Sequence, residues 1–288
     1  MLTALLATKY SIKKAQNIDT LLCAMPSVSP LSGRQGEAAE AICTILSNFI
    51  PITLHELDKV ALLNRIDTKF IFHSNDLAAI LEEVCNDYYV LEIEEKRQFR
   101  YESLYFDTPD YDLYKFHHNG KLNRVKIRYR KYLDSNLCYF EVKYKVNGGM
   151  RTDKRRFKTP EIARVLKTPE LALIYHPQLD NTLLQPTLWV HFTRITLASR
   201  QMNERLTLDI NLNFSTDTHV QPLENLVIAE IKTEKSCFNS PIIKAFKARH
   251  YEQSGFSKYA IGTALLAPVK YNNFKPQLIK LAKILQLF

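Results

Sequence analysis

Basic side chains recur at every second position in several segments of this 288-residue sequence. Five segments show the pattern, some with acidic or hydroxyl residues among the bases: Arg124, Lys126, Arg128 and Arg130; Glu141, Lys143 and Lys145; Lys154 and Arg156; Arg205, Thr207 and Asp209; and Glu230, Lys232 and Glu234. Side chains of a β-strand alternate between its two faces, so each group would share one face. Arginine grips phosphate oxygens with two parallel N–H groups and lysine supplies a point charge, so such faces suit phosphate-rich anions.

Two carboxylates, Glu141 and Glu230, stand among these bases. Carboxylate oxygens suit Mg²⁺ or Mn²⁺, and such ions usually bridge protein carboxylates to phosphate oxygens. We therefore expect Glu230 and Glu141 to hold Mn²⁺ or Mg²⁺. Cations around a divalent metal fit phosphoryl transfer, which depends more on positioning and charge neutralisation than on covalent chemistry.

Strands must position these side chains, and strand-like segments outnumber helical ones. The predicted strands are 65–73, 89–95, 101–108, 123–132, 138–146, 153–158, 188–199, 204–214 and 225–234. The predicted helices are 53–64, 75–88, 160–175, 240–250 and 257–266. Many strands with short connections favour an antiparallel sheet over alternating β-α-β units.

The charged faces allow two interpretations. One face of an antiparallel sheet often lies in water and is charged for that reason. However, bases dominate strand after strand, and like charges opposite each other destabilise a sheet. Helices are also available to cover the apolar faces. We therefore predict an α+β fold, a closed antiparallel β-barrel with helices packed outside and the charged faces pointing inward.

The sequence divides into three parts. Residues 1–50 are expected to be an N-terminal extension with little order and no chemistry, because Pro, Ser and Gly gather in its segment 25–36. Residues 51–271 would form the barrel domain, which opens with Thr53 and Glu56 at the spacing of a helix capping box. Residues 272–288 would form a basic amphipathic helix whose apolar face docks onto the barrel.

The composition of the sequence indicates which class of partner and which cellular compartment to expect. The formal charge of +9 favours polyanionic partners. The five scattered cysteines lack zinc-ligand spacing and indicate a reducing compartment. We read neither a signal peptide nor a membrane span, so a cytoplasmic protein is expected, free or peripheral at the inner face of the membrane. The cluster of Asp107, Asp110 and Asp112 around Pro109 predicts a capped turn rather than a metal site.

The order of several short runs resembles a known family. The runs are R-I-D-T-K-F (65–70), Y-F-D-T (105–108), R-Y-R-K-Y (128–132), E-V-K (141–143), K-R-R-F (154–157), the segment around Arg194, R-L-T-L-D (205–209), E-I-K (230–232) and F-S-K-Y (256–259). Together they resemble the VTC domain, the catalytic domain of the vacuolar transporter chaperone polyphosphate polymerase. That domain is a triphosphate tunnel metalloenzyme, whose fold is a closed antiparallel barrel around a basic tunnel. The resemblance spans roughly residues 53–266.

The resemblance implies roles for individual residues. Those expected to act on phosphates in catalysis are Lys69, Arg128, Arg130, Lys143, Lys154, Arg194, Arg205 and Lys258. Substrate binding is expected from Arg65, Arg156, Lys232 and Ser257, and metal binding from Glu230 assisted by Glu141. The first strand carries Arg65, Asp67 and Lys69 where the triphosphatase branches carry E-x-E-x-K, which fits the VTC branch better. Gly255 stands where that branch can carry another lysine.

Three functions follow from these expectations. The first is a metal-dependent polyphosphate polymerase that moves the γ-phosphate of ATP onto a growing chain and works with a separate membrane protein. The second is hydrolysis of triphosphate or a nucleoside triphosphate by the same fold. The third is a non-catalytic module that binds polyphosphate or RNA. No specific nucleic acid is expected, because the aromatic residues of the strands alternate away from the basic face.

Overall fold

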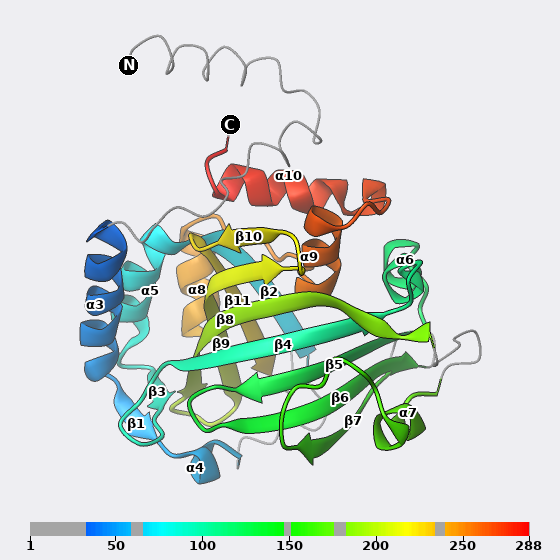
Figure 1. The fold of residues 1–288 in the computed structure, drawn as a ribbon. Coiled ribbons are helices and arrows are strands. Elements are labelled where there is room, and N and C mark those ends of the chain that lie inside the picture. The colour runs from blue at the N-terminus through cyan, green and yellow to red at the C-terminus, as the bar shows by residue number, and fades with distance from the viewer. Residues whose placement is uncertain (1–32, 59–65, 147–150, 176–182, 234–239, 288) are drawn as a thin grey trace.

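One sheet of eleven strands dominates the fold (Figure 1). The computed structural model describes residues 33–58, 66–146, 151–175, 183–233 and 240–287. The strands are β1 (Ile50–Ile52), β2 (Ile66–His73), β3 (Tyr88–Leu91), β4 (Phe99–Asp107), β5 (Arg124–Tyr132), β6 (Leu137–Val146), β7 (Arg151–Thr159), β8 (Gln185–Ser199), β9 (Glu204–Ser215), β10 (Val220–Leu223) and β11 (Leu226–Thr233). The helices are α3 (Gly33–Ser47), α4 (Leu54–Asp58), α5 (Leu77–Val84), α6 (Asp112–His118), α7 (Thr168–Leu173), α8 (Pro241–Ala248), α9 (Lys258–Leu266) and α10 (Lys275–Ile284), with 3₁₀ turns η1 (Ser74–Asp76) and η3 (Asn272–Phe274).

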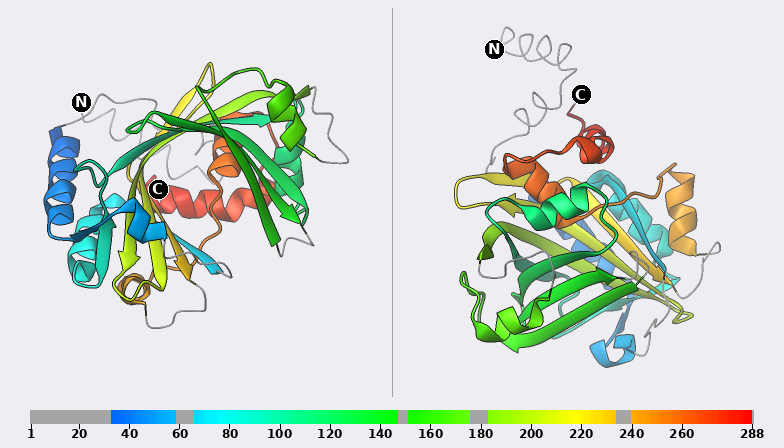
Figure 2. Two further views of the ribbon diagram at one scale, coloured as in Figure 1. Left: turned by 90° about the horizontal axis from the view of Figure 1, so that it is seen from below. Right: turned by 90° about the vertical axis from the view of Figure 1, so that its right-hand side faces the viewer.

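The main path of the sheet runs β2-β11-β9-β8-β4-β5-β6-β7, and every neighbouring pair in it is antiparallel. Three short strands extend it: β10 pairs with β9, β3 pairs with β8, and β1 runs parallel to β3. The sheet curves so strongly that its strands surround an interior, with β5, β6 and β7 on the side opposite β2 (Figure 2). The α+β class and the antiparallel sheet are therefore as predicted.

The predicted closure of the barrel is not found. In the described residues the end strands β2 and β7 do not pair, so hydrogen bonds do not close the sheet. The free edge of β2 is used by another segment instead. Phe70 forms a bridge with Gln253, and the N–H of Ser254 donates to the carbonyl of Lys69 at 2.8 Å. A strand partner on that edge would have to displace these contacts.

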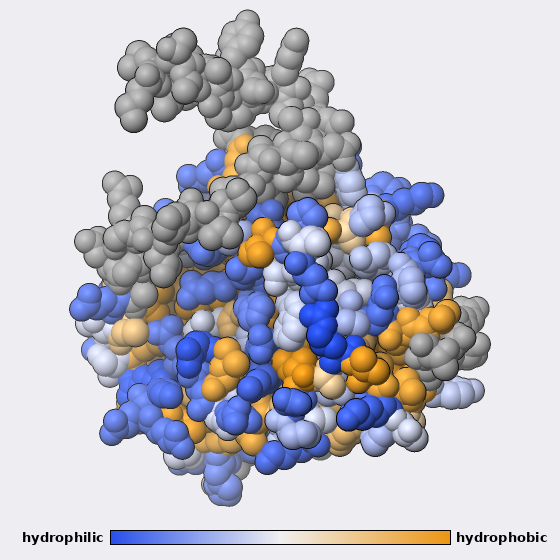
Figure 3. Space-filling view, viewed as in Figure 1, coloured by the Kyte–Doolittle hydropathy of each residue, from blue (hydrophilic) through white to orange (hydrophobic). Residues whose placement is uncertain are grey.

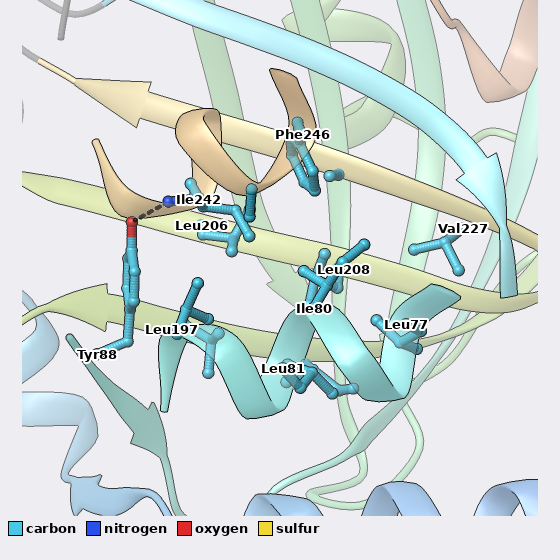
Figure 4. Close-up of a cluster of buried hydrophobic side chains, with 14 of the residues drawn as sticks. Leu77, Ile80, Leu81, Tyr88, Leu197, Leu206, Leu208, Val227, Ile242 and Phe246 are labelled. Atoms are coloured by element: carbon cyan, nitrogen blue, oxygen red, sulfur yellow. Dashed lines mark hydrogen bonds between the residues drawn. The ribbon is translucent and has the colours of Figure 1, made fainter. Parts of the chain in front are cut away.

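Helices cover the apolar outer faces of the strands. The apolar residues of α5 recur at helical spacing, so Leu77, Ile80 and Leu81 are all buried on one side. They pack with α8 and with Leu206 and Leu208 of β9 in one hydrophobic cluster (Figure 4). A second outer cluster covers β4 to β7 and includes residues of α6 and α7. Burial of both outer faces leaves the opposite face of the sheet turned toward the interior.

The N-terminal part of the described chain is joined to this core. Leu46 and Phe49 are almost fully buried in the same cluster as α5. Arg97 donates to the backbone carbonyls of both residues, at 3.1 Å for Phe49. The pairing of β1 with β3 extends the contact. The expected boundary at residue 51 therefore falls inside a packed region, because α3 ends in apolar residues that need cover.

The predicted capping box and helices agree with the structure to different extents. The capping box is present: the Thr53 N–H donates to Glu56 at 2.9 Å and the Glu56 N–H donates to the Thr53 hydroxyl at 3.3 Å. The rest of the predicted helix 53–64 lies largely outside the described residues. The segment 160–175 is helical only over α7. The C-terminal helix α10 docks as expected, with Leu278 and Leu281 buried.

The surface shows hydrophobic residues scattered among hydrophilic ones on the face drawn in Figure 3. Exposed large hydrophobic residues such as Leu122, Val165 and Tyr175 come from separate parts of the chain. In the part of the chain that the structure describes, every helix is too short or too polar to cross a membrane.

Candidate functional site

The inner surface of the sheet has two halves of opposite character, which are called here the charged half and the apolar half. Strand β9 contributes to both. Arg205 and Asp209 belong to the charged half, where Asp209 forms an ion pair with Arg194 of β8. Leu212 and Phe214 belong to the apolar half, where they pack with α9. A single strand thus changes from charged to apolar within a few residues.

A β-bulge makes this change possible. The register between β8 and β9 shifts between the pairs His191–Asn213 and Thr193–Ile210, so β9 has one extra residue there. Asn211 adopts a left-handed conformation with φ of 52°. Asparagine tolerates this region better than most residues, and a bulge changes which side chains face inward. The inward positions therefore pass from odd numbers up to Asp209 to even numbers from Leu212.

Helix α9 fills the apolar half. It packs with inward residues of β2, β4, β8, β9 and β11, and α10 covers it from outside (Figure 1). Contact is so close at Gly262 that a Cβ atom there would lie 2.7 Å from Phe214 and 2.8 Å from Leu188. Only a residue without a side chain fits at this point. An extended ligand bound along the charged half would therefore meet packed protein at α9.

Three inward carboxylates organise the charged half, and each lies between two cations. The three groups, called here the carboxylate triads, are Lys69–Glu230–Lys232, Arg128–Glu141–Lys154 and Arg194–Asp209–Lys258. The ion-pair distances are 2.5 and 3.6 Å at Glu230, 2.6 and 2.7 Å at Glu141, and 2.6 Å from Asp209 to Arg194. Each triad carries one net positive charge when all three groups are ionised.

The triads keep their carboxylates ionised. Burial alone would raise the pKa of Glu141, but Arg128, Arg130 and Lys154 hold that pKa well below its usual value. The pKa of Asp209 is likewise low, because Arg194 and Lys258 outweigh its burial. Lys232 and Lys69 do the same for Glu230. Carboxylates in this condition are weak proton acceptors.

Aromatic rings line the boundary between the two halves. The guanidinium groups of Arg130 and Arg194 lie over the rings of Tyr101 and Phe192, at 5.2 to 5.8 Å from the ring centres. The ammonium of Lys258 lies 4.4 Å from the centre of Phe192. The expectation that aromatic residues avoid the basic face is therefore wrong here. It fails because cation–π contacts hold closely spaced cations without requiring an acid for each.

Two inward lysines face other lysines, rather than a carboxylate, across the ladder of β5, β6 and β7. Lys126 of β5 lies opposite Lys143 of β6, which in turn lies opposite Lys154 of β7. The Lys126 ammonium donates to the Ser257 hydroxyl at 2.8 Å. Burial lowers its pKa well below the ordinary value, and the charges of Lys143, Arg124, Arg128 and Lys69 lower it further. Lys143 keeps access to solvent; burial and the charges of Arg128 and Lys69 lower its pKa, although Glu230 and Asp67 act in the opposite direction. An anion placed here would relieve this repulsion.

The remaining predicted residues lie around these groups. Ser257 caps α9 by accepting the N–H of Ala260 at 3.2 Å. Arg205 donates to the carbonyl of Leu57 in α4 at 2.6 Å, so it lies at the far end of the charged half from α9. Arg156 is exposed and lies over Tyr139 at 4.9 Å. Arg65 lies outside the described residues. The structure thus brings the other predicted residues onto one inner surface.

Asp107 is a structural anchor beside the site. Its carboxylate accepts backbone N–H groups of Thr108, Leu113 and Tyr114 at 2.8 to 2.9 Å. It also accepts the hydroxyl of Tyr259, the residue after Lys258. Burial raises its pKa to about 6. The predicted capped turn is therefore confirmed, and the same carboxylate ties α6 to α9.

The comparison with family models matches the VTC domain over residues 64–267. This range covers most of the chain, including every carboxylate triad. The chain belongs to the VTC domain family. That family is a branch of the triphosphate tunnel metalloenzymes, and the resemblance seen in the short sequence runs is thereby confirmed. No curated protein sequence matched the chain.

Three solved structures are similar to the chain at low identity and low TM-score. A putative adenylyl cyclase from Hippeastrum, described as having a dominant triphosphatase activity, is 14% identical with a TM-score of 0.44, over 70% of this chain and 97% of its own. A putative adenylate cyclase from Bacillus halodurans is 14% identical with a TM-score of 0.41, over 68% and 96%. A protein from Pyrococcus horikoshii is 17% identical with a TM-score of 0.37, over 68% and 98%.

The tunnel metalloenzymes use a divalent metal, so the carboxylates of the charged half are its candidate ligands. Among the described residues, no group of three His, Cys, Asp or Glu side chains is placed to hold a metal. Glu230 and Glu141 are instead each engaged by two cations. Mg²⁺ commonly uses only one or two protein carboxylates together with substrate phosphates and water. The VTC-domain residues therefore fit a metal that arrives with a phosphate ligand.

Several site residues were not assigned a role from the sequence. Asp209 lies on the inward face of its strand and its spacing from Arg205 pointed to it, but only the ion pairs show its function. Lys126 likewise shares the alternating face of Arg128. The sequence did not indicate the role of Tyr101 and Phe192. An aromatic residue that stacks on a cation cannot be distinguished by sequence from one that packs in the hydrophobic core.

Proposed function

We propose that this VTC-domain protein is a metal-dependent polyphosphate polymerase that transfers the γ-phosphoryl group of ATP to the end of a polyphosphate chain. The observation that carries the proposal is the state of the three triad carboxylates. Each is held between two cations, and each has a pKa below its usual value. A general base works best when its pKa lies near the working pH, so none of the three is suited to activate water.

A phosphate acceptor needs no such base. In the proposed reaction an ionised terminal oxygen of the chain attacks the γ-phosphorus. The bond from that phosphorus to the bridging oxygen breaks, and ADP leaves with the electron pair. The chain gains one phosphate, and no proton has to be removed from the nucleophile. The main barrier is repulsion between two anions, which a surface rich in cations lowers.

The proposed roles follow the placement of the residues. The groups that neutralise the reacting phosphates are Lys69, Arg128, Arg130, Lys143, Lys154, Arg194, Arg205 and Lys258. Arg65, Arg156, Lys232 and Ser257 bind the rest of the substrate. Glu230, assisted by Glu141, would hold Mn²⁺ or Mg²⁺. When bound, the ion would neutralise phosphate oxygens and fix their orientation.

The direct test incubates purified protein with ATP and Mn²⁺ and follows ADP, free phosphate and chain length together. The proposal expects ADP to form in step with polyphosphate of increasing length. Free phosphate in step with ADP, without any chain longer than the substrate, would show a hydrolase instead. Binding of polyphosphate without any ADP would show a non-catalytic binding module.

A second test replaces Glu230, the proposed metal ligand. Glu230→Gln keeps the size of the side chain but removes its charge, so turnover should fall by at least 100-fold. Tripolyphosphate binding without metal should persist, because Lys69 and Lys232 then lack their counter-ion. The matched control is Glu82→Gln, at an exposed position of α5. Normal Mn²⁺-dependent turnover by Glu230→Gln would exclude Glu230 as the ligand.

A separate membrane protein as partner remains part of the proposal. Its only support is the family resemblance. A crosslinking pull-down from detergent extracts, with the polyphosphate-bound protein as bait, should recover an integral membrane protein. Recovery of soluble proteins alone would count against such a partner.

A further inference from the structure

The charged surface continues past the carboxylate triads, along the ladder between β5 and β6. Two successive inward cross-strand pairs there are wholly basic: Arg124 opposite Lys145, and Lys126 opposite Lys143. The next pair, Arg128 opposite Glu141, contains an acid. Like charges directly opposite each other on neighbouring strands destabilise the pairing. The fold therefore tolerates a local excess of charge at the end of the ladder nearest α6.

Helix α6 adds His117 to this end of the ladder. The imidazole is held edge-on against Phe274, with ring centres 5.5 Å apart. Burial lowers its pKa to about 2, and the charges of Lys126, Arg124 and Lys145 act in the same direction. Three basic side chains therefore oppose protonation of this imidazole. Burial and the charges of Arg124 and Lys69 lower the pKa of Lys145, whereas Asp67 acts in the opposite direction.

Two buried polar atoms in this group have no hydrogen-bond partner within the described chain. They are Nδ1 of His117 and Nε of Arg124. Buried polar atoms are rarely left without a partner in folded proteins, and each exception needs an explanation. A bound anion would supply acceptors for the Arg124 N–H and for the neighbouring ammonium groups.

The group is continuous with the proposed reaction site. Lys126 belongs to both, because its ammonium reaches Ser257 next to Lys258 and its charge acts on Arg128. The alternative direction, along the axis of the curved sheet, is occupied by α9 at Gly262. Because α9 blocks that direction, the basic pairs of β5 and β6 offer a longer chain a continuous path of cations toward α6.

We infer that Arg124, Lys126, Lys145 and His117 form a second anion site, which binds phosphate groups of a polyphosphate chain beyond those at the reaction site. The chain runs along the inner face of β5 and β6 toward the end of these strands beside α6, rather than toward α9. The choice of polyphosphate as the ligand rests on the proposed function. The site itself can be tested without turnover.

The experiment compares two ligands in the absence of ATP. Affinities for tripolyphosphate and for long-chain polyphosphate are measured by calorimetry on the wild type and on the double variant Arg124→Ala/Lys145→Ala. Tripolyphosphate binding should stay within about twofold, because the triads are untouched. Long-chain binding should weaken by about tenfold, which corresponds to about 1.4 kcal/mol. Equal loss for both ligands, or no loss for either, overturns the inference.

The matched control is Lys131→Ala/Arg155→Ala, which removes two cations from positions of β5 and β7 next to the inward ones. It should change neither affinity by more than about twofold. Loss of long-chain binding in this control would show that total charge, not the site, sets the affinity. If the wild type binds long chains selectively but makes none from ATP, the proposed polymerase fails while this site stands. If it makes chains and the Arg124/Lys145 variant binds them normally, only the site fails.

Discussion

The two halves of the inner surface share strands, but one half is closely packed with apolar side chains and the other is lined by charged ones. The apolar half is filled by α9, to the point that Gly262 admits no side chain. The charged half gathers cations around three carboxylates, and its Lys126 and Lys143 face other lysines across the ladder of β5, β6 and β7. Packing in the apolar half stabilises the folded protein, whereas repulsion between cations in the charged half destabilises it. The difference teaches that this fold confines close packing to one end so that the other can hold unbalanced charge.

Removal of a large side chain from the apolar half should have the largest effect on stability. Phe214→Ala would leave a cavity against α9, because Phe214 is fully buried there. A loss of about 3–5 kcal/mol in the free energy of unfolding is expected. Urea denaturation followed by circular dichroism measures it. A loss below about 1 kcal/mol would mean that α9 does not depend on this packing.

The charged half should respond in two opposite ways to loss of a cation. Arg194→Ala takes two hydrogen bonds from the buried Asp209 and should cost about 2 kcal/mol. Lys143→Ala removes a cation that faces two other lysines and should raise stability by about 0.5 kcal/mol. Thermal melting of both variants, beside the wild type, decides the matter. Destabilisation by both would show that the attraction of Lys143 to Glu230 and Asp67 outweighs the repulsion from the two lysines.

A bound anion should reduce the difference in stability between Lys143→Ala and the wild type. Tripolyphosphate at about 100 times its dissociation constant should stabilise the wild type by about 2.7 kcal/mol. Lys143→Ala should gain less, because its charged half already has weaker repulsion. Melting curves with and without the ligand give the difference. A wild type whose melting is indifferent to tripolyphosphate would contradict an anion site on the inner surface.

The last expected effect is a loss of folding stability at acidic pH. The folded-state pKa of Asp209 lies below its unfolded value, so its contribution is present above about pH 4 and is lost as the pH falls toward the folded value. Between pH 5 and pH 3 this should remove about 1 kcal/mol. Asp209→Asn should flatten that slope, whereas the exposed control Glu82→Gln should not. Parallel slopes in the wild type and Asp209→Asn would show that Asp209 is not ion-paired in solution.

The sequence predicted the strands and the basic faces well, because period-two alternation is a local property. The predicted strand 123–132 corresponds to β5, and its alternating bases do face inward. The same rule fails in β9, since the extra residue at Asn211 exchanges the two faces beyond Asp209. The local sequence pattern does not predict this β-bulge. The open edge of the sheet and the burial of Phe49 also depend on contacts between distant segments, which one sequence does not encode visibly.

The unclosed sheet has a consequence for the behaviour of the protein at high concentration. A free strand edge offers unpaired backbone groups to a strand of another molecule, which is a route to aggregation. The two edges are protected differently: residues 253–254 cover β2, whereas β7 presents the exposed, densely charged side chains of Lys154, Arg155, Arg156 and Lys158. Positive charge on an edge strand repels an identical edge. The bases of β7 that were assigned to phosphate binding would therefore also keep neighbouring molecules apart, and a polyanion that neutralises them would remove that protection.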